Sequence, residues 1–141
     1  MNTTTIFKEN EIKKTLARTA ILDILKRVKK PIDVSEIIER LKSMKIKIDR
    51  VTVFRNINLL VKKELISKVE FNEGKYRYEL SSLPHHHHLV CTKCGRINDI
   101  ESNPLHKEID KISETVNKIY DFKIEEHKVE FFGKCKICKG K

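Results

Sequence analysis

The sequence predicts an α+β chain of two small domains: a winged helix-turn-helix over residues 1–83 and a small α/β domain over residues 84–141. Three observations lead to this prediction. Helical hydrophobic periodicity recurs three times and is followed by a pair of alternating segments. Four consecutive histidines then run into a Cys-x-x-Cys pair, and a second such pair lies at the far end of the sequence.

Three helices are expected in the first domain. Residues 15–29 carry apolar side chains at helical spacing. Asp33, with Glu36 three residues later, has the pattern of a helix N-cap and begins the second helix. Asp49 is expected to cap a third helix over residues 50–63.

A hairpin is expected after the helices. Residues 65–71 and 76–80 alternate apolar and polar side chains around a turn at residues 72–75, and residues 81–84 form a short linker. Three helices followed by two strands make a winged helix-turn-helix. Its third helix would enter the major groove of DNA, and its wing would contact the backbone.

The distribution of charge favours a polyanionic partner. Residues 1–84 carry 19 Lys and Arg against 11 Asp and Glu, a net charge of +8, whereas residues 85–141 carry 11 against 9. The positive potential that a phosphate backbone attracts therefore lies in the winged helix. Opposite the apolar face of the third helix lie the polar residues Arg50, Thr52, Arg55 and Asn58.

The sequence also restricts the cellular setting. No apolar run approaches the ~20 residues of a membrane span. Residues 1–10 lack the apolar region of a signal peptide. We therefore expect a cytoplasmic protein with no membrane partner, in which two tight cysteine pairs favour zinc over disulfides.

The second domain is expected to mix strands with one helix. Residues 88–91 and 96–100 resemble strands on either side of a zinc knuckle, and residues 104–120 have helical periodicity. A final strand or strand pair is expected over residues 122–124 and 128–132. Two cysteine pairs suit tetrahedral Zn²⁺ with no open position, which is typical of a structural site. The four expected ligands are Cys91, Cys94, Cys135 and Cys138.

The histidine run predicts two further sites. Side chains alternate between the faces of a strand, so His86 and His88 share one face while His85 and His87 share the other. Imidazole mixed with carboxylate suits Fe²⁺, Mn²⁺ or Zn²⁺ without choosing among them. The side chains that could complete these half-sites are Glu79, Asp99, Asp110 and His127. His106 is interpreted as a lone surface histidine.

The chain resembles the ferric uptake regulator (Fur) family, whose members include iron, zinc, manganese and peroxide sensors. The matching stretches cover nearly the whole chain and are residues 16–22, 51–60, 85–95 and 127–135. The resemblance implies a homodimer joined through the C-terminal domains. Two winged helices would then bind a palindromic double-stranded operator.

The resemblance also assigns residues. It places a structural Zn²⁺ on Cys91, Cys94, Cys135 and Cys138. It places a regulatory Fe²⁺, Mn²⁺ or Zn²⁺ on Glu79, His86, His88 and Asp99. A second mixed-ligand site falls on His85, His87, Asp110 and His127. The implied DNA contacts are Arg50, Thr52, Phe54 and Arg55.

Two positions depart from the family pattern. Many members take a regulatory histidine from the DNA-binding domain, but no histidine precedes His85 here, which leaves Glu79 as the expected ligand from that domain. Phe54 stands where the family usually has a tyrosine. It keeps apolar contact with a base and loses the hydroxyl.

These patterns favour a metal-dependent transcriptional repressor of metal uptake or homeostasis genes over an enzyme. A peroxide-sensing repressor of the same family is the alternative, favoured by an aspartate at position 99. A zinc-dependent hydrolase is a remote alternative, since the sequence has no His-Glu-x-x-His motif. A zinc-ribbon RNA-binding protein would suit the charge but not the three-helix-plus-wing pattern.

Overall fold

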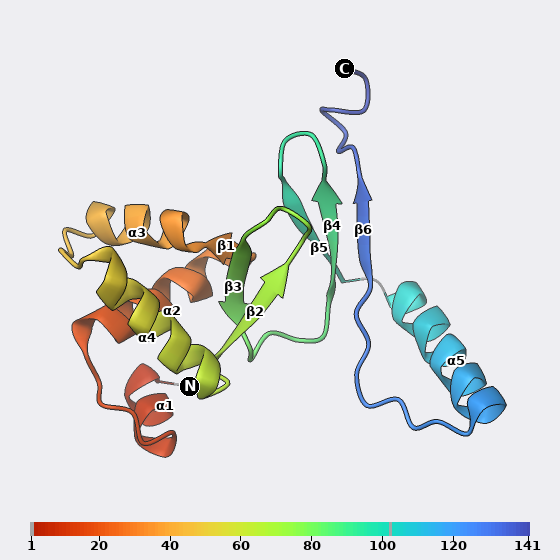
Figure 1. Cartoon of the computed structure of the whole chain (residues 1–141), viewed down its shortest axis with the longest axis horizontal. Helices are drawn as coiled ribbons and strands as arrows, with labels where there is room; N and C mark the ends of the chain where they lie inside the picture. The colour runs from red at the N-terminus through yellow and green to blue at the C-terminus, as the bar shows by residue number, and fades with distance from the viewer. Residues whose placement is uncertain (1, 102) are drawn as a thin grey trace. The chain divides into compact units, whose positions relative to one another are not determined.

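The computed structural model describes residues 2–101 and 103–141 and divides the chain into two compact units, Met1–Pro84 and His85–Lys141 (Figure 1). The division falls one residue beyond the expected boundary. Both units mix helices and strands, so the predicted α+β fold class is confirmed.

The first unit contains the three predicted helices and one more. The additional helix is α1 (Thr3–Glu9), and the predicted ones are α2 (Leu16–Val28), α3 (Val34–Ser43) and α4 (Arg50–Lys62). Asp33 caps α3 by accepting a hydrogen bond from the Glu36 backbone N–H at 2.9 Å. Asp49 caps α4 in the same way through Thr52, also at 2.9 Å. Both caps satisfy N–H groups that have no partner inside the helix.

A three-stranded antiparallel sheet completes the first unit. The predicted hairpin forms from β2 (Ile66–Glu70) and β3 (Tyr76–Leu80). The sheet order is β1-β3-β2, because the short strand β1 (Ile32–Asp33) pairs with the other edge of β3. Asn72 and Gly74 both have positive φ at the hairpin tip, a conformation that glycine and asparagine tolerate best.

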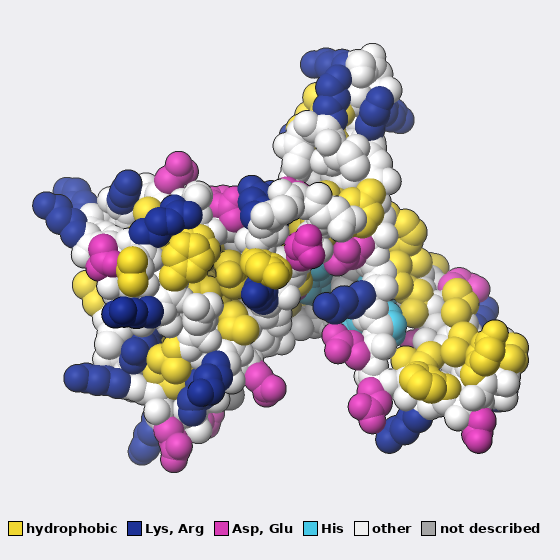
Figure 2. Space-filling view, in the orientation of Figure 1, with side chains coloured by type: hydrophobic (Ala, Val, Ile, Leu, Met, Phe, Trp, Pro, Cys, Tyr) yellow, Lys and Arg dark blue, Asp and Glu magenta, His cyan; other side chains and the backbone are white. Residues whose placement is uncertain are grey.

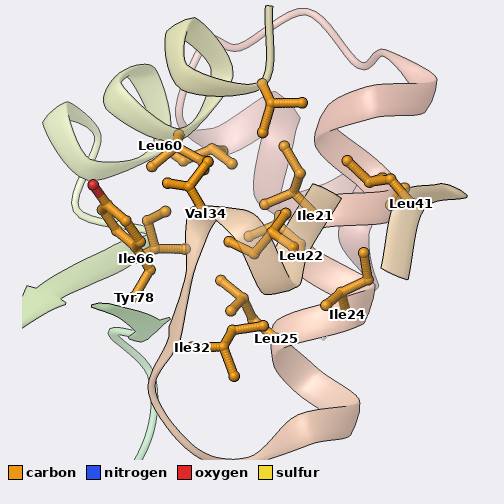
Figure 3. Packing of buried hydrophobic residues seen from close by; sticks show 14 of the residues in the cluster. Ile21, Leu22, Ile24, Leu25, Ile32, Val34, Leu41, Leu60, Ile66 and Tyr78 are labelled. Atoms are coloured by element: carbon orange, nitrogen blue, oxygen red, sulfur yellow. The ribbon is translucent and has the colours of Figure 1, made fainter. Parts of the chain in front are cut away.

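One hydrophobic core holds these elements together (Figure 3). Ile21 of α2, Ile37 of α3 and Ile57 of α4 are fully buried, and Ile66 and Tyr78 close the core from the sheet. The periodicity that predicted each helix therefore marks its buried face. This packing fixes α4 while its opposite face stays exposed.

The second unit is a small sheet with one long helix. The strands β4 (His87–Cys91), β5 (Ile97–Ile100) and β6 (Glu130–Gly133) have the order β5-β4-β6. β4 is antiparallel to β5 and parallel to β6. The predicted strand over residues 122–124 does not form, because this segment folds back on the preceding helix. There, the backbone N–H of Ile124 donates to the side chain of Asn117 at 3.0 Å.

The helix of this unit, α5 (Asn103–Tyr120), is amphipathic and poorly covered. Ile109 is buried, but Ile112, Ile119 and Tyr120 are mostly exposed. Figure 2 shows hydrophobic side chains gathered at the C-terminal end of this helix. Across the described residues, no helix combines the length and apolar character needed to span a bilayer.

Candidate metal centres and nucleic-acid surface

The four cysteines converge at one end of the second unit. Cys91 ends β4, Cys94 lies in the following turn, and Cys135 and Cys138 lie in a turn after β6. Their Sγ atoms all lie within 4.8 Å of one another, and all four are free thiols. The parallel pairing of β4 with β6 aligns Cys91 with Gly133 and so brings the two pairs together.

The geometry of this cluster fits a tetrahedral zinc ion. The Sγ atoms of Cys94 and Cys135 are 3.8 Å apart. Two sulfurs bound to one tetrahedral Zn²⁺ at ~2.3 Å would themselves lie about 3.8 Å apart. The residues present therefore suit a zinc ion.

Electrostatics at the cluster favour thiolates at some positions. The backbone N–H of Cys135 donates to the Cys91 sulfur at 3.3 Å. This hydrogen bond and another from the Cys94 backbone lower the pKa of Cys91 to about 6. Burial raises the pKa of Cys138 to about 12. A bound dication would oppose that desolvation, since zinc takes cysteine as thiolate.

One face of β4 gathers two histidines and a carboxylate. The ring centroids of His86 and His88 are 4.8 Å apart. The β4–β5 register pairs His88 with Asp99, which places its Oδ1 3.7 Å from the His88 Nε2. Glu79, expected to join this set, is a buried residue of β3 in the first unit.

The other face gathers the remaining histidines of the run with His127. The candidate ligand atoms of His85, His87 and His127 lie within 4.8 Å of one another, and Nε2 of His85 is 3.0 Å from Nε2 of His127. Burial, followed by the neighbouring imidazoles, lowers the pKa of His85 and of His87. Both rings are therefore neutral and available as metal ligands near neutral pH.

Asp110, the fourth residue expected at this second mixed-ligand site, does not join the three histidines. Asp110 is exposed on α5 and lies outside the group formed by the three histidines, although its charge partly offsets the lowering of the His85 pKa. His106, one turn earlier on α5, is half-buried, and its ring centroid lies 5.5 Å from that of His85 and 5.2 Å from that of His87. The interpretation of His106 as a surface residue is therefore wrong. Its spacing of three from the inward-facing Ile109 was the available signal.

The exposed face of α4 carries most of the expected DNA contacts. Arg50, Phe54 and Arg55 are exposed, and the Arg50 guanidinium carbon lies 5.4 Å from the centroid of the Phe54 ring. Thr52 is half-buried, and its hydroxyl donates to Asp49 Oδ2 at 2.6 Å. Thr52 thus has a role in the cap beside any role at DNA. Lysine and arginine side chains are spread over the visible face of this unit (Figure 2).

Comparison with known proteins agrees with this geometry. A sequence model of the Ferric uptake regulator family matches residues 9–132. The ferric uptake regulation protein of Bacillus subtilis is 36% identical over 93 residues, which cover 64% of this chain and 60% of that protein. The chain spans 53% to 60% of the length of the Bacillus and Campylobacter relatives that it matches.

Solved structures extend the match. The Vibrio cholerae ferric uptake regulator superposes with a TM-score of 0.81 at 27% identity, covering 95% of this chain and 100% of that one. The Helicobacter pylori regulator, described as having three functional metal binding sites, gives 0.80 at 25% identity, covering 96% and 88%. With the family match over residues 9–132 and the Cys and His clusters in place, the chain belongs to the ferric uptake regulator family.

Proposed function

We propose that the protein is a metal-responsive transcriptional repressor that binds palindromic operator DNA as a cytoplasmic homodimer. One observation carries the proposal. A single strand, β4, ends in a cysteine cluster suited to zinc and presents histidines on both faces, in a chain that also contains a basic winged helix. Such a chain combines a metal site with a surface that a phosphate backbone attracts.

The regulatory ion is proposed to bind His86, His88 and Asp99, with Glu79 as the ligand from the first domain. Imidazole and carboxylate together suit Fe²⁺, Mn²⁺ or Zn²⁺. Linking Glu79 to the second domain would favour one arrangement of the two winged helices, the one that matches successive half-sites. A coupling free energy of about 1–3 kcal/mol is enough to change DNA affinity by roughly 5- to 150-fold.

The DNA contacts are proposed to come from α4. Arg50 and Arg55 are exposed cations at a helix that would enter the major groove, where arginine recognises guanine. Phe54 is exposed beside Arg50, so it can contact a thymine methyl group. Thr52 contributes by holding the N-terminus of the helix through Asp49.

The homodimer is proposed to form through the second domain. Leu89 and Phe131 are paired across β4 and β6, and both are exposed, with 46% and 43% of their surface accessible. Exposed apolar side chains that lie together often mark a surface that a partner covers.

Anaerobic fluorescence anisotropy tests the proposal. Chelator-treated protein with its cysteine site reloaded with zinc would be titrated onto its own promoter DNA with Fe²⁺, Mn²⁺ or Zn²⁺. We expect one metal to raise the affinity. The Glu79→Ala variant should lose this dependence, and Glu70→Ala, which removes an exposed carboxylate of β2, should keep it. Affinity that ignores every metal would overturn the regulatory role.

Peroxide sensing is a second candidate, favoured by the short carboxylate of Asp99, which lies 3.7 Å from His88. A peroxide sensor would gain an oxygen atom on a ligand histidine when the iron-loaded protein is treated with peroxide. The oxidised protein would then dissociate from DNA. Mass spectrometry of the histidine-containing peptides decides between the two, because an unmodified protein that still binds DNA would exclude sensing.

A further inference from the structure

We propose that His85, His87, His106 and His127 form a four-imidazole site that binds Zn²⁺, and more broadly ions such as Ni²⁺ and Cu²⁺, in preference to Mn²⁺. The site lies wholly within the second domain. The inference concerns its ligand set and its metal class, so it goes beyond the regulatory site proposed above and does not depend on DNA binding.

The four rings come from three separate parts of the domain. His85 lies just before β4 and His87 begins it, His106 lies in the first turns of α5, and His127 lies shortly before β6. The ring centroid of His85 lies 4.8 Å from that of His87 and 4.8 Å from that of His127. His87 completes the arrangement at 5.2 Å from His106 and 5.5 Å from His127. The candidate ligand atoms of His85, His87 and His127 therefore form one group, and the ring of His106 lies beside those of His85 and His87.

Two of the rings have a buried nitrogen without a partner. His87 is only 2% exposed, and its Nε2 has no hydrogen-bond partner among the described residues. His106 is half-buried, and its Nε2 is likewise a buried atom without a hydrogen-bond partner among the described residues. A buried polar atom without a hydrogen bond costs about 1–3 kcal/mol, so such atoms in a cluster of ligands point to an ion.

The hydrogen bonding of the other nitrogens supports metal binding. A hydrogen bond with the Val129 backbone is one of the interactions that set the pKa of His87, and it leaves Nε2 facing the cluster. Metal-bound histidines commonly donate their second ring N–H in this way. Nε2 of His85 and Nε2 of His127 are 3.0 Å apart, close to the separation of about 3.3 Å between two nitrogens bound to one tetrahedral zinc.

The donor atoms determine the metal class. The group formed by His85, His87 and His127 contains no carboxylate, and the His106 ring centroid lies 5.5 Å from that of His85. Imidazole suits Zn²⁺, Cu²⁺ and Ni²⁺, whereas Mn²⁺ prefers oxygen ligands and binds nitrogen sites more weakly in the divalent series. The opposite face of β4 keeps Asp99 beside His88. The two faces of β4 thus offer different ligand sets, one of imidazoles alone and one that includes a carboxylate.

The test uses full-length His88→Ala protein, which weakens the opposite site, with zinc already in the cysteine site. Co²⁺ would be titrated and followed by its visible absorption, and Zn²⁺ and Mn²⁺ would then compete for the site. We expect one tetrahedral Co²⁺ per chain, displaced by Zn²⁺ but not by Mn²⁺. His106→Gln should weaken Co²⁺ by more than the roughly 10- to 100-fold that loss of a supporting hydrogen bond costs.

Two further variants separate the possibilities. Asp110→Asn is the matched control on the same helix and should leave Co²⁺ affinity unchanged. His106→Asp should bring Mn²⁺ and Zn²⁺ affinities closer together, because it replaces an imidazole with a carboxylate. Circular dichroism and the zinc content of the cysteine site report whether each variant folds. If Asp110→Asn weakens Co²⁺ while His106→Gln does not, or if Mn²⁺ competes as well as Zn²⁺, the proposal is wrong.

Discussion

Asp33 uses its two carboxylate oxygens for two different elements. Oδ1 caps α3, and Oδ2 accepts a hydrogen bond from Lys75 Nζ at 2.5 Å near the hairpin tip. Asp33→Ala removes both interactions. We expect it to lower the free energy of unfolding by about 1 kcal/mol, the typical effect of losing an N-cap, as measured by urea denaturation. The ion pair adds little because Lys75 is well exposed.

Asp33→Asn separates the two contributions, because asparagine caps a helix as well as aspartate does. It should retain most of the stability, and a loss as large as that of Asp33→Ala would contradict the dominant role of the cap. Burial raises the pKa of Asp33, but the hydrogen bonds from Lys75 and the Glu36 backbone outweigh it and hold the pKa below its ordinary 3.8. The stabilisation is therefore present above about pH 4 and is lost as the pH falls through the lower folded-state value.

The positions of the histidines could be predicted from the sequence only in part. The pairing of alternate histidines on opposite faces follows from the period of two in a strand, so it could be predicted. The place of His106 could not be predicted in the same way. It depends on how α5 is rotated against the sheet, for which the available sequence signal is the spacing of three residues between His106 and the inward-facing Ile109. The sequence favours Asp110 because a carboxylate suits a mixed site and because the family resemblance places a ligand there.

The link between α2 and α4 is a polar contact inside the first domain. Arg18 Nε donates to Asn56 Oδ1 at 2.9 Å, and Asn56 Nδ2 donates to the Thr52 carbonyl at 2.8 Å. Asn56 is only 8% exposed, so its buried Oδ1 depends on Arg18 for a hydrogen bond. This contact positions the DNA-binding helix against the rest of the domain.

A double-mutant cycle with Arg18→Ala and Asn56→Ala measures this link. We expect a coupling free energy of about 1.5 kcal/mol, because the hydrogen bond has a charged donor and a buried acceptor. Asn58→Ala, at an exposed position of the same helix, should couple to Arg18→Ala by less than about 0.5 kcal/mol. Equal coupling in the two cycles would show that the Arg18–Asn56 contact does not position α4.

At the level of elements, most helices could be predicted because apolar period and caps agree. The caps at Asp33 and Asp49 coincide with the start of a buried face in both cases. β1 was missed because two residues carry no periodicity, and only pairing with β3 makes them a strand. The segment at residues 122–124 alternates like a strand, but a hydrogen bond from Ile124 to Asn117 holds it against the end of α5.

The two domains differ in how much of their stability comes from apolar burial. Among the described residues, 17 buried hydrophobic residues lie in the first unit and five in the second. Two of those five are the cysteines Cys91 and Cys138. A domain this small with so little core usually needs a metal or a partner to fold.

Cys135→Ser tests this dependence. We expect the variant to lose one zinc equivalent per chain and the cooperative melting of the second domain, while the first domain still unfolds in its own transition. Metal analysis and differential scanning calorimetry measure the two effects. Lys136→Ser, between the two cysteines of the same turn, should retain both zinc and the transition. If the Cys135→Ser protein kept its zinc content, zinc bound by the four cysteines would not be the source of the second domain's stability.

The exposed pair Leu89 and Phe131 tests the proposed dimer, on which the geometry of operator binding depends. Leu89→Glu places a charge in the middle of the apolar patch, and burying it against a second copy would carry a desolvation cost of several kcal/mol. We expect a monomer by light scattering. Because two tethered winged helices bind a palindrome with an effective concentration that a monomer lacks, DNA affinity should fall by about 100-fold or more.

Lys93→Glu makes a larger change in charge at an exposed turn of the same domain and should leave the dimer intact. A Leu89→Glu protein that stays dimeric would mean that another surface joins the two copies, and the exposed face of α5 would then be the next to alter, through Ile119→Glu.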